Sequence, residues 1–500
     1  MNLTLKYTAS CLLAFCCVPD TAMAAENAKI TDYYSIEEIK LPEGVPPEVG
    51  AVKFDTEGTI YVALRRGDIL MAKPTADPSK FQWKLFASGF HNACGMEVVA
   101  PGHILISQMA ELTEVKDTDS DGEADSYKNL TDAWGVSGNY HETNEICPDG
   151  KGGYYIAVGT ASYNGPTFYN VKGEYSKTGR RGRNFSSVKW KGWIMHYSKD
   201  GVVTPHASGF RMHNGITRDK MGNIWATDNQ GDWRATTPLY HIEKGNFYGH
   251  PSSLVWDPKW PKGKDPLKMP LTEIDAMRTR ASVLLPHKEF NRSASEPAQV
   301  PKNFGPFADQ LLIPDNNGTR ISRVMLEKVQ GKYQGACTHF FNDVGLKTGG
   351  NRAVFTDDGK TLFVGHTVRG WGNPGEGLTR ITYLGKEPFD VKHVKLSETG
   401  FDLKFTHSFD KKALASKDFS VRSFRYEDKW SYGGPQLDKR NEKVTSVESN
   451  EGDTIVLNVQ NLEAGRVYWI EISKNSKLMS ESGQPLMNKQ FCYTLNQLVK

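Results

Sequence analysis

Short apolar runs bounded by Gly, Asp and Asn recur through the first four-fifths of the chain, and no long stretch has helical periodicity. Runs of this length that are rich in aromatic and β-branched residues are typical of β-strands. The repeated unit is a strand, a tight turn containing glycine, and a second strand. Its clearest copies are 51–63 (AVKFDTEGTIYVA), 145–157 (EICPDGKGGYYIA), 215–226 (GITRDKMGNIWA) and 352–364 (RAVFTDDGKTLFV).

Two weaker copies of this unit lie at 95–107 and 307–323. Six copies at intervals of tens of residues indicate a propeller, in which each small sheet packs against its neighbours around a central channel. The pattern therefore predicts an all-β protein with a six-bladed β-propeller over residues 45–385.

The repeated turn is no longer found after about residue 385, although short strands continue to be predicted. The runs 401–406 (FDLKFT), 454–459 (TIVLNV) and 467–472 (VYWIEI) are separated by turns that contain glycine. This spacing suits an immunoglobulin-like β-sandwich of roughly 100 residues, which we expect over residues 387–500. A seventh blade is the alternative, but the segment is too long for one blade and lacks the turn.

The first 24 residues have the features of a secretory signal peptide. Lys6 precedes an apolar run from Leu12 to Phe15, and the small residues Ala22 and Ala24 precede the expected cleavage site. A lipoprotein signal ending at Cys16 is an alternative, which bulky Phe15 disfavours. No later stretch approaches the roughly 20 apolar residues of a transmembrane helix. The mature chain is expected to be periplasmic or secreted.

Charge and cysteine content exclude some functions. The formal net charge is +3, with dispersed Lys and Arg, so no nucleic-acid partner is expected. Removal of the signal peptide leaves Cys94, Cys147, Cys337 and Cys492, which form no CxxC pair. They can form disulfides in an oxidising compartment, but the sequence does not say which residues pair. No CxxCH haem motif occurs.

Residues 117–125 (DTDSDGEAD) form the sharpest local motif. Alternating short carboxylates can surround one point with oxygen atoms, and the glycine permits a sharp turn, as Ca²⁺ coordination requires. Position twelve is Lys128 where an EF-hand has a bidentate glutamate, so we expect a structural calcium loop. An acidic turn without an ion is the alternative. The expected ligands are Asp117, Asp119, Asp121, Glu123 and Asp125.

Two further motifs can carry chemistry. His141 lies in WGVSGNYHE (134–142), and its near-neutral intrinsic pKa suits proton transfer. Arg211 lies in GFRMHNG (209–215), and its planar guanidinium can bind both oxygens of a carboxylate. A structural hydrogen-bonding histidine and an interblade salt bridge are the corresponding alternatives.

The order of these motifs, followed by GNIWATD (222–228) and GNFYGHP (245–251), resembles the soluble glucose/sorbosone dehydrogenases. Those proteins are six-bladed propellers that bind pyrroloquinoline quinone and Ca²⁺ in the central channel. The resemblance covers about residues 45–385. The calcium loop, WGVSGNYHE and TDNQGDW (227–233) also resemble the "membrane-bound dehydrogenase domain" propellers, whose activity is largely inferred.

The resemblance implies a role for several residues. His141 matches the base that takes a proton from the anomeric hydroxyl of a sugar, and Arg211 matches the arginine over the quinone. The turn Asn229-Gln230-Gly231 matches the one whose carbonyls bind the catalytic Ca²⁺. Contacts to the quinone carboxylates are expected from Arg320, Arg323, His366 and Arg369. The family's lysine has no secure counterpart in this sequence.

Three function classes follow from these observations. The first is a calcium-dependent quinoprotein dehydrogenase that oxidises a carbohydrate or a related alcohol or aldehyde. Without a haem motif, it would pass electrons to a separate acceptor. The second is a calcium-dependent hydrolase or lyase of the lactonase type, and the third is a non-catalytic carbohydrate-binding protein. A basic cluster able to bind a tricarboxylated quinone favours the first, and acids around a metal favour the second.

Overall fold

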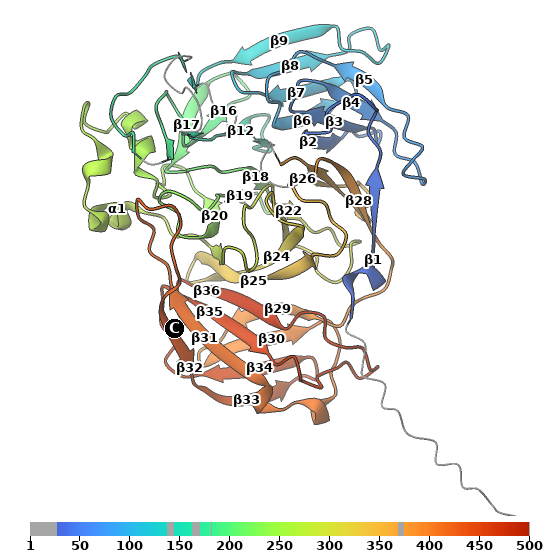
Figure 1. Cartoon of the computed structure of the whole chain (residues 1–500), viewed down its shortest axis with the longest axis vertical. Helices are drawn as coiled ribbons and strands as arrows, with labels where there is room; N and C mark the ends of the chain where they lie inside the picture. Colours follow the sequence, from blue (N-terminus) through green and yellow to red (C-terminus); the bar gives the residue numbers. More distant parts are fainter. Residues whose placement is uncertain (1–27, 138–144, 163–170, 182, 369–374, 500) are drawn as a thin grey trace, which may run out of the picture.

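The computed structural model describes residues 28–137, 145–162, 171–181, 183–368 and 375–499. Nearly all regular structure in these residues is β-strand (Figure 1). The expected signal peptide lies outside the described residues. The helical segments are η1 (Ile30–Asp32), η2 (Pro251–Trp256), η3 (Pro266–Lys268), α1 (Leu271–Met277), η4 (Lys411–Ala413) and η5 (Ser416–Asp418).

Most strands up to residue 383 belong to four-stranded antiparallel sheets. The first contains β2 (Val49–Phe54), β3 (Ile60–Leu64), β4 (Ile69–Ala72) and β5 (Lys84–Ala87). The second contains β6 (Gly95–Ala100), β7 (His103–Ser107), β8 (Leu112–Lys116) and β9 (Ser126–Thr131). The third contains β11 (Ile146–Pro148), β12 (Tyr154–Val158), β16 (Trp193–Tyr197) and β17 (Val203–Ser208). The fourth contains β18 (Gly215–Arg218), β19 (Ile224–Thr227), β20 (Thr237–Ile242) and β21 (Val283–Leu285).

The N-terminal strand completes a sheet formed late in the chain. β1 (Tyr34–Ile39) pairs with β28 (Gly377–Tyr383), which continues into β27 (Thr361–His366) and β26 (Gly350–Phe355). The first strands of the sheets contact one another around the centre: β2 contacts β6 and β26, and β11 contacts β6 and β18. This closed arrangement of small sheets is propeller-like (Figure 1).

The repeated turn of the sequence connects the first two strands of four of these sheets. In each turn an aspartate carboxylate accepts backbone N–H bonds two residues onward, as Asp55 does from Glu57 (2.9 Å). The equivalent aspartates are Asp149 and Asp219, whereas Thr356 stands at this place in the fourth turn and Asp358 accepts from Lys360 N (3.0 Å). An aspartate of this kind stabilises a tight turn, and the glycine supplies the positive φ, which is +77° at Gly58.

A longer sheet joins the propeller region to the C-terminal region. It contains β22 (Ala298–Gln299), β23 (Leu311–Pro314), β24 (Arg320–Val329) and β25 (Lys332–Asn342), and then β36 (Gln490–Leu495), β35 (Arg466–Ile472), β31 (Phe419–Arg425) and β32 (Leu437–Glu442). The junction is the antiparallel pairing of β25 with β36. Figure 1 shows the C-terminal strands, in orange and red, beside β24 and β25.

The C-terminal region has a second sheet, and its apolar core also includes Met325 of β24 and Ala336 of β25. That sheet contains β29 (Val391–Leu396), β30 (Gly400–Phe405), β34 (Thr454–Val459) and β33 (Val444–Asn450). Buried side chains from both sheets, including Phe401, Leu457 and Ile470, share one core. Packing of two antiparallel sheets in this way is a sandwich arrangement.

Two small sheets lie in the long connections of the propeller region. They pair β10 (Val136–Ser137) with β14 (Val171–Lys172), and β13 (Ala161–Ser162) with β15 (Asn184–Phe185). The connections that contain β13 to β15 and η2 to α1 are much longer than the turns elsewhere. Among the described residues, every helix is too short or too polar to cross a bilayer.

Candidate functional site

Arg211 lies in the loop that leads into β18. Its backbone N–H donates to Asp228 Oδ2 (2.9 Å), and the N–H of Met212 donates to Oδ1 (2.7 Å). Asp228 also pairs with Arg234 at 2.9 Å, and both side chains are fully buried. Burial raises the pKa of Asp228, but Arg234 and the backbone donors outweigh burial, so the net shift is downward. Asp228 therefore stays ionised and fixes the backbone at Arg211.

The turn at Asn229, Gln230 and Gly231 passes directly over the Arg211 guanidinium. A Cβ atom on Gly231 would lie 2.1 Å from Arg211 Cζ, so any larger residue there would displace the Arg211 guanidinium. The carbonyl of Gly231 accepts bonds from the N–H groups of Arg234 and Gly433, both at 3.0 Å. The Gly231 oxygen is therefore already used by backbone donors and is not left for Ca²⁺. Gln230 Nε2 donates to Ala235 O (3.1 Å).

The second donor to Gly231 comes from a loop of the C-terminal region, residues 426–436, which we call the covering loop. It connects β31 to β32 and reaches the propeller region beside α1 (Figure 1). Asp428 anchors it by accepting bonds from Ala235 N (2.7 Å) and Arg278 Nη1 (2.5 Å). Its Tyr432 ring centroid lies 5.1 Å from Arg211 Cζ. Arg211 is consequently only 5% exposed.

Two more arginines contact the aromatic rings of the covering loop. Arg181 Cζ lies 4.8 Å from the Trp430 ring centroid, and Arg183 Cζ lies 5.0 Å from that of Tyr432. Both arginines are exposed, and the rings are 57% and 51% exposed. Arg181, Arg183 and Arg211 with these two rings form what we call the mouth cluster. Exposed guanidiniums of this kind can bind carboxylates in bidentate fashion.

Arg352 fills the centre of the propeller region. Its guanidinium donates to Cys94 O (2.6 and 3.0 Å) and to Asn214 O (2.8 Å), and so ties β26 to the segments before β6 and β18. It also forms an ion pair with Glu145, and both side chains are fully buried. Burial acts to raise the pKa of Glu145, and the adjacent Arg352 guanidinium opposes that shift.

A second ion pair lies near this centre. Lys53 Nζ and Glu296 Oε1 are 2.8 Å apart. Burial lowers the pKa of Lys53, but Glu296, Glu97 and Glu145 together outweigh burial and the net shift is upward. The pKa of neighbouring Glu97 is raised by burial, which Lys53 opposes. These buried acids are thus largely neutralised by the protein's own cations, Lys53 and Arg352.

Two of the expected quinone contacts lie on β24 and have other partners. Arg320 Nη1 donates to the carbonyls of Lys288 (2.7 Å) and Glu289 (3.0 Å). Arg323 is fully buried and pairs with Asp390 of the C-terminal region at 2.7 Å. These contacts give both arginines structural roles, and the structure does not bring them to Arg211.

His366, at the end of β27, is also occupied. Its Nε2 lies 2.9 Å from Thr379 Oγ1, and its Nδ1 lies 3.2 Å from Thr348 O. Burial lowers its pKa to about 4. A neutral imidazole with both nitrogens engaged is poorly suited to bind a carboxylate. His141 and Arg369 lie outside the described residues.

The expected calcium loop connects β8 to β9 at the outer edge of its sheet. Asp117, Asp119 and Asp121 each offer a carboxylate oxygen within 4.8 Å of the others. Asp125 is turned toward Thr118 and accepts bonds from its N–H (3.0 Å) and its hydroxyl (2.6 Å). Backbone N–H groups bond to several of these carboxylates, such as that of Glu123 to Asp121 (2.8 Å). Three of the five expected ligands are therefore grouped.

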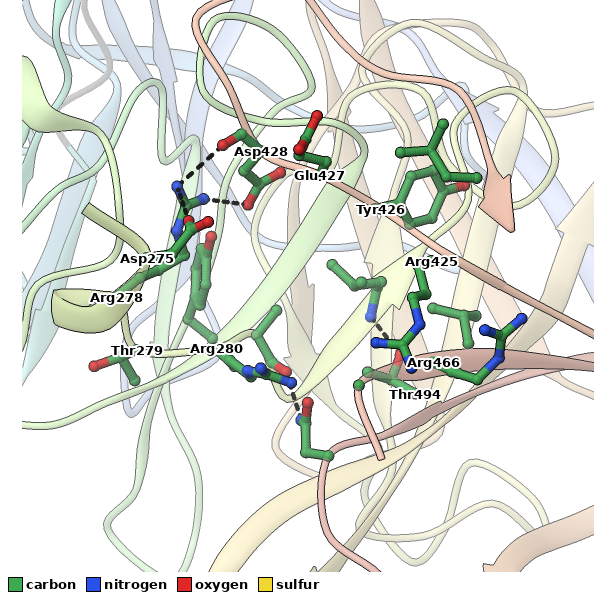
Figure 2. A pocket seen from close by; sticks show the side chains of 17 residues that line it. Asp275, Arg278, Thr279, Arg280, Arg425, Tyr426, Glu427, Asp428, Arg466 and Thr494 are labelled. Atoms are coloured by element: carbon green, nitrogen blue, oxygen red, sulfur yellow. Dashed lines mark hydrogen bonds and ion pairs between the residues drawn. The ribbon is translucent and has the colours of Figure 1, made fainter. Parts of the chain in front are cut away.

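A pocket of about 440 Å³ lies at the junction of the two regions (Figure 2). Four arginines line it: Arg278, Arg280, Arg425 and Arg466. Arg278 pairs with Asp428, Arg425 with Glu463 and Arg466 with Asp438. Most of its charge is therefore neutralised within the junction, and we assign the pocket no ligand.

Sequence reasoning missed most of the mouth cluster. The RRGR run at 180–183 was a usable signal, because three arginines in four residues are unusual in this chain. Trp430 and Tyr432 gave no such signal, since more than 200 residues separate them from Arg211. Arg352 lies in the last clear repeat, where its neighbours suggested only a strand.

Comparisons with known proteins fit this architecture. A family profile described as "Domain of unknown function (DUF7133)" matches residues 75–281. No protein of curated function matches the chain in sequence. A Carbohydrate-Active Enzymes Family AA12 structure from Trichoderma reesei is 11% identical, with a TM-score of 0.52 over 72% of this chain and 97% of its own.

Two quinoprotein structures are also similar. The PQQ domain of pyranose dehydrogenase from Coprinopsis cinerea is 14% identical, with a TM-score of 0.50 over 70% of this chain and 95% of its own. PQQ-bound aldose sugar dehydrogenase from Streptomyces coelicolor is 12% identical, with a TM-score of 0.48 over 70% and 98%. The chain has the propeller fold of the quinoprotein sugar dehydrogenases. Identities this low carry the fold and not the activity.

Proposed function

We propose that this protein is an exported quinoprotein dehydrogenase that oxidises a sugar or a related alcohol or aldehyde. The observation that carries the proposal is the mouth cluster, in which Arg181, Arg183 and Arg211 surround two aromatic rings. Such a cluster suits pyrroloquinoline quinone, which has three carboxylates. A metal-dependent hydrolase needs free acids around its ion, whereas the channel glutamates Glu145 and Glu296 are paired with cations.

The proposed roles follow from the chemistry of each residue. Arg211 and Arg183 bind and orient the quinone carboxylates, and bound quinone supplies the two-electron acceptor. His141 accepts the proton of the anomeric hydroxyl. We do not retain Arg320, Arg323 and His366 as cofactor contacts, because their polar atoms have structural partners. Because the sequence carries no CxxCH haem motif, the electrons would leave to a separate acceptor.

The remaining features complete the proposal. Calcium is bound by Asp117, Asp119 and Asp121, away from the mouth cluster, and stabilises the hairpin of β8 and β9. Residues 1–24 direct export to the periplasm or medium. We infer six blades over residues 45–385 and an immunoglobulin-like sandwich over 387–500. The ring of sheets and the shared C-terminal core support these assignments.

Quinone titration of the purified protein tests the function. With Ca²⁺ present, we expect a quinone absorption band and dye reduction that depends on added sugar. His141→Ala should lower turnover by about 10² to 10⁴ with unchanged quinone affinity, because a base acts in the transition state. Arg211→Ala should instead need more quinone for saturation.

Arg66→Ala is the matched control, because its side chain is 67% exposed and lies on the surface with Glu48. It should change neither quinone affinity nor turnover. A wild-type protein that binds no quinone would exclude the dehydrogenase. Hydrolysis of sugar lactones by that same protein would then favour the hydrolase.

A further inference from the structure

A cleft of about 410 Å³ lies beside β16, and none of its lining residues belongs to the mouth cluster. Residues 174–178, 189–190 and 255–264 contribute to its walls, and we call it the tryptophan cleft. Two insertions form it: the connection between β12 and β16, and the connection between β20 and α1. Four aromatic rings line it, those of Tyr175, Trp190, Trp256 and Trp260.

The three indole rings are half-buried and firmly held. Trp256 Nε1 donates to Ser186 O (3.1 Å), and Trp260 Nε1 donates to Lys264 O (2.9 Å). Trp190 and Trp256 pack against one apolar core, and Trp260 packs against another. With their N–H groups satisfied by backbone carbonyls, the indoles of Trp256 and Trp260 offer the cleft mainly their apolar ring surfaces.

Trp190 has an unusual backbone conformation. Its φ is +67°, in the left-handed region that bulky residues rarely adopt. Its ring meets Trp193 edge-on, with ring centroids 5.3 Å apart. Conformations of this kind persist only where the surrounding structure enforces them, and they concentrate at functional sites.

Hydrogen bonds between the two insertions fix the walls of the cleft. Ser252 Oγ donates to Gly179 O (2.7 Å) and accepts from Ser186 N (2.6 Å). Gly179 N donates to Asp265 Oδ1 (3.1 Å). The cleft is therefore preformed, so a ligand would not have to order its walls.

The rim of the cleft carries both acidic and basic side chains, which can accept and donate hydrogen bonds. Glu174 and Lys189 are 3.3 Å apart, and Asp257, Lys262 and Lys264 line the other wall. Lys264 Nζ lies 5.1 Å from the Trp260 ring centroid. Apolar ring surfaces surrounded by exposed polar groups match a sugar ring, which has C–H faces and a hydroxyl edge.

We propose that the tryptophan cleft binds an oligosaccharide chain by ring stacking. Its volume lies in the usual range of small-molecule sites, and the three lysines against two acids favour a chain that carries carboxylates. This inference goes beyond the proposed dehydrogenase, because its residues are not those of the mouth cluster. It gives the protein a means of holding a polymer while the channel acts on a small sugar.

Calorimetric titration of the protein without quinone tests the cleft independently of the dehydrogenase. The probes are cellotetraose, a neutral chain, and tetragalacturonate, a chain of uronic acids. Trp260→Ala should weaken binding by about tenfold or more, as removal of a central tryptophan does at binding sites. Trp83→Ala is the matched control: Trp83 is also half-buried, its Nε1 donates to Lys40 O (2.8 Å), and it lies elsewhere.

Lys262→Glu provides a second variant that should not disturb folding, because Lys262 is exposed. It should weaken tetragalacturonate several-fold and leave cellotetraose unchanged. Melting curves of each variant separate lost binding from lost structure. The proposal is overturned if neither chain binds the wild type, or if Trp260→Ala, still folded, binds both chains as the wild type does.

Discussion

Asp390→Ala should strongly destabilise the protein, because Asp390 holds a buried arginine where the two regions meet. Its Oδ2 accepts from Arg323 Nη2 (2.7 Å) and from Asn488 Nδ2 (2.8 Å), and Oδ1 accepts from Val391 N (2.8 Å). Burial raises the pKa of Asp390 although Arg323 opposes the shift. The carboxylate is thus fully desolvated and is balanced by one guanidinium and a few donors.

The size of the destabilisation follows from the Arg323 charge, which stays buried after the substitution. Without Asp390, Arg323 retains Gln310 Oε1 (3.0 Å) and Val391 O (3.0 Å) as acceptors but loses its only paired carboxylate among the described residues. An uncompensated buried charge costs about 3–5 kcal/mol. Lys220→Ala is the control: Lys220 and Asp309 form an exposed pair at 3.9 Å, which contributes about 0–1 kcal/mol.

Urea denaturation followed by tryptophan fluorescence measures both variants. Asp390→Ala should lower the free energy of unfolding by about 3–5 kcal/mol. We expect a single transition, because the shared sheet couples the two regions. Replacing both partners, Arg323→Met with Asp390→Leu, should recover most of the loss, because no charge then remains buried. A loss below about 1 kcal/mol in Asp390→Ala would refute this account of the junction.

Four further outcomes are expected. Truncation after Gly385 should give aggregation on gel filtration, because it exposes the edge of β25 and unpairs Arg323; a monodisperse product would contradict this. Asp119→Asn should remove the rise in melting temperature that Ca²⁺ gives the wild type; a wild-type melting curve indifferent to chelator excludes the loop. Cys337 and Cys492 are opposite one another on β25 and β36, at a spacing that permits a disulfide. Both are free, buried thiols in the structure, so the test is made on exported protein unfolded in urea. It should resist alkylation there until it is reduced, and full labelling in urea without reductant counts against the disulfide. His366 has its pKa lowered to about 4, so it contributes stability above pH 6.5 that is lost as pH falls through 4. His366→Gln should make the fall in the free energy of unfolding between pH 7 and 5 smaller by about 2 kcal/mol. Equal pH profiles of stability for the variant and the wild type would exclude this.

The repeated part of the fold could be predicted from the sequence because its signals are local. An aspartate, a positive-φ glycine and a flanking apolar pair fix each turn within about a dozen residues, as around Asp55 and Gly58. The grouping of Asp117, Asp119 and Asp121 was predictable for the same reason. Features determined within one hairpin need no knowledge of the rest of the chain.

The joining of the two regions could not be predicted in this way. The pairing of β25 with β36 connects residues about 150 positions apart, and no local pattern specifies it. Residues 320–323 contain two arginines in a family-like context, yet Arg323 is fully buried and pairs with Asp390. Charge and motif position alone do not distinguish a ligand-binding arginine from a buried structural one.

The covering loop places a constraint on any ligand of Arg211. A carboxylate that approaches this guanidinium meets the Tyr432 ring on one side and the backbone of Gly231 on another. Displacement of Tyr432 would break the bonds of the loop to Gly231 and Ala235 and would have to be offset by a stronger contact. Approach along Arg183, which is exposed on the same ring, breaks none of these bonds. The geometry therefore favours a ligand that first binds the exposed arginines and meets Arg211 only at its inner end.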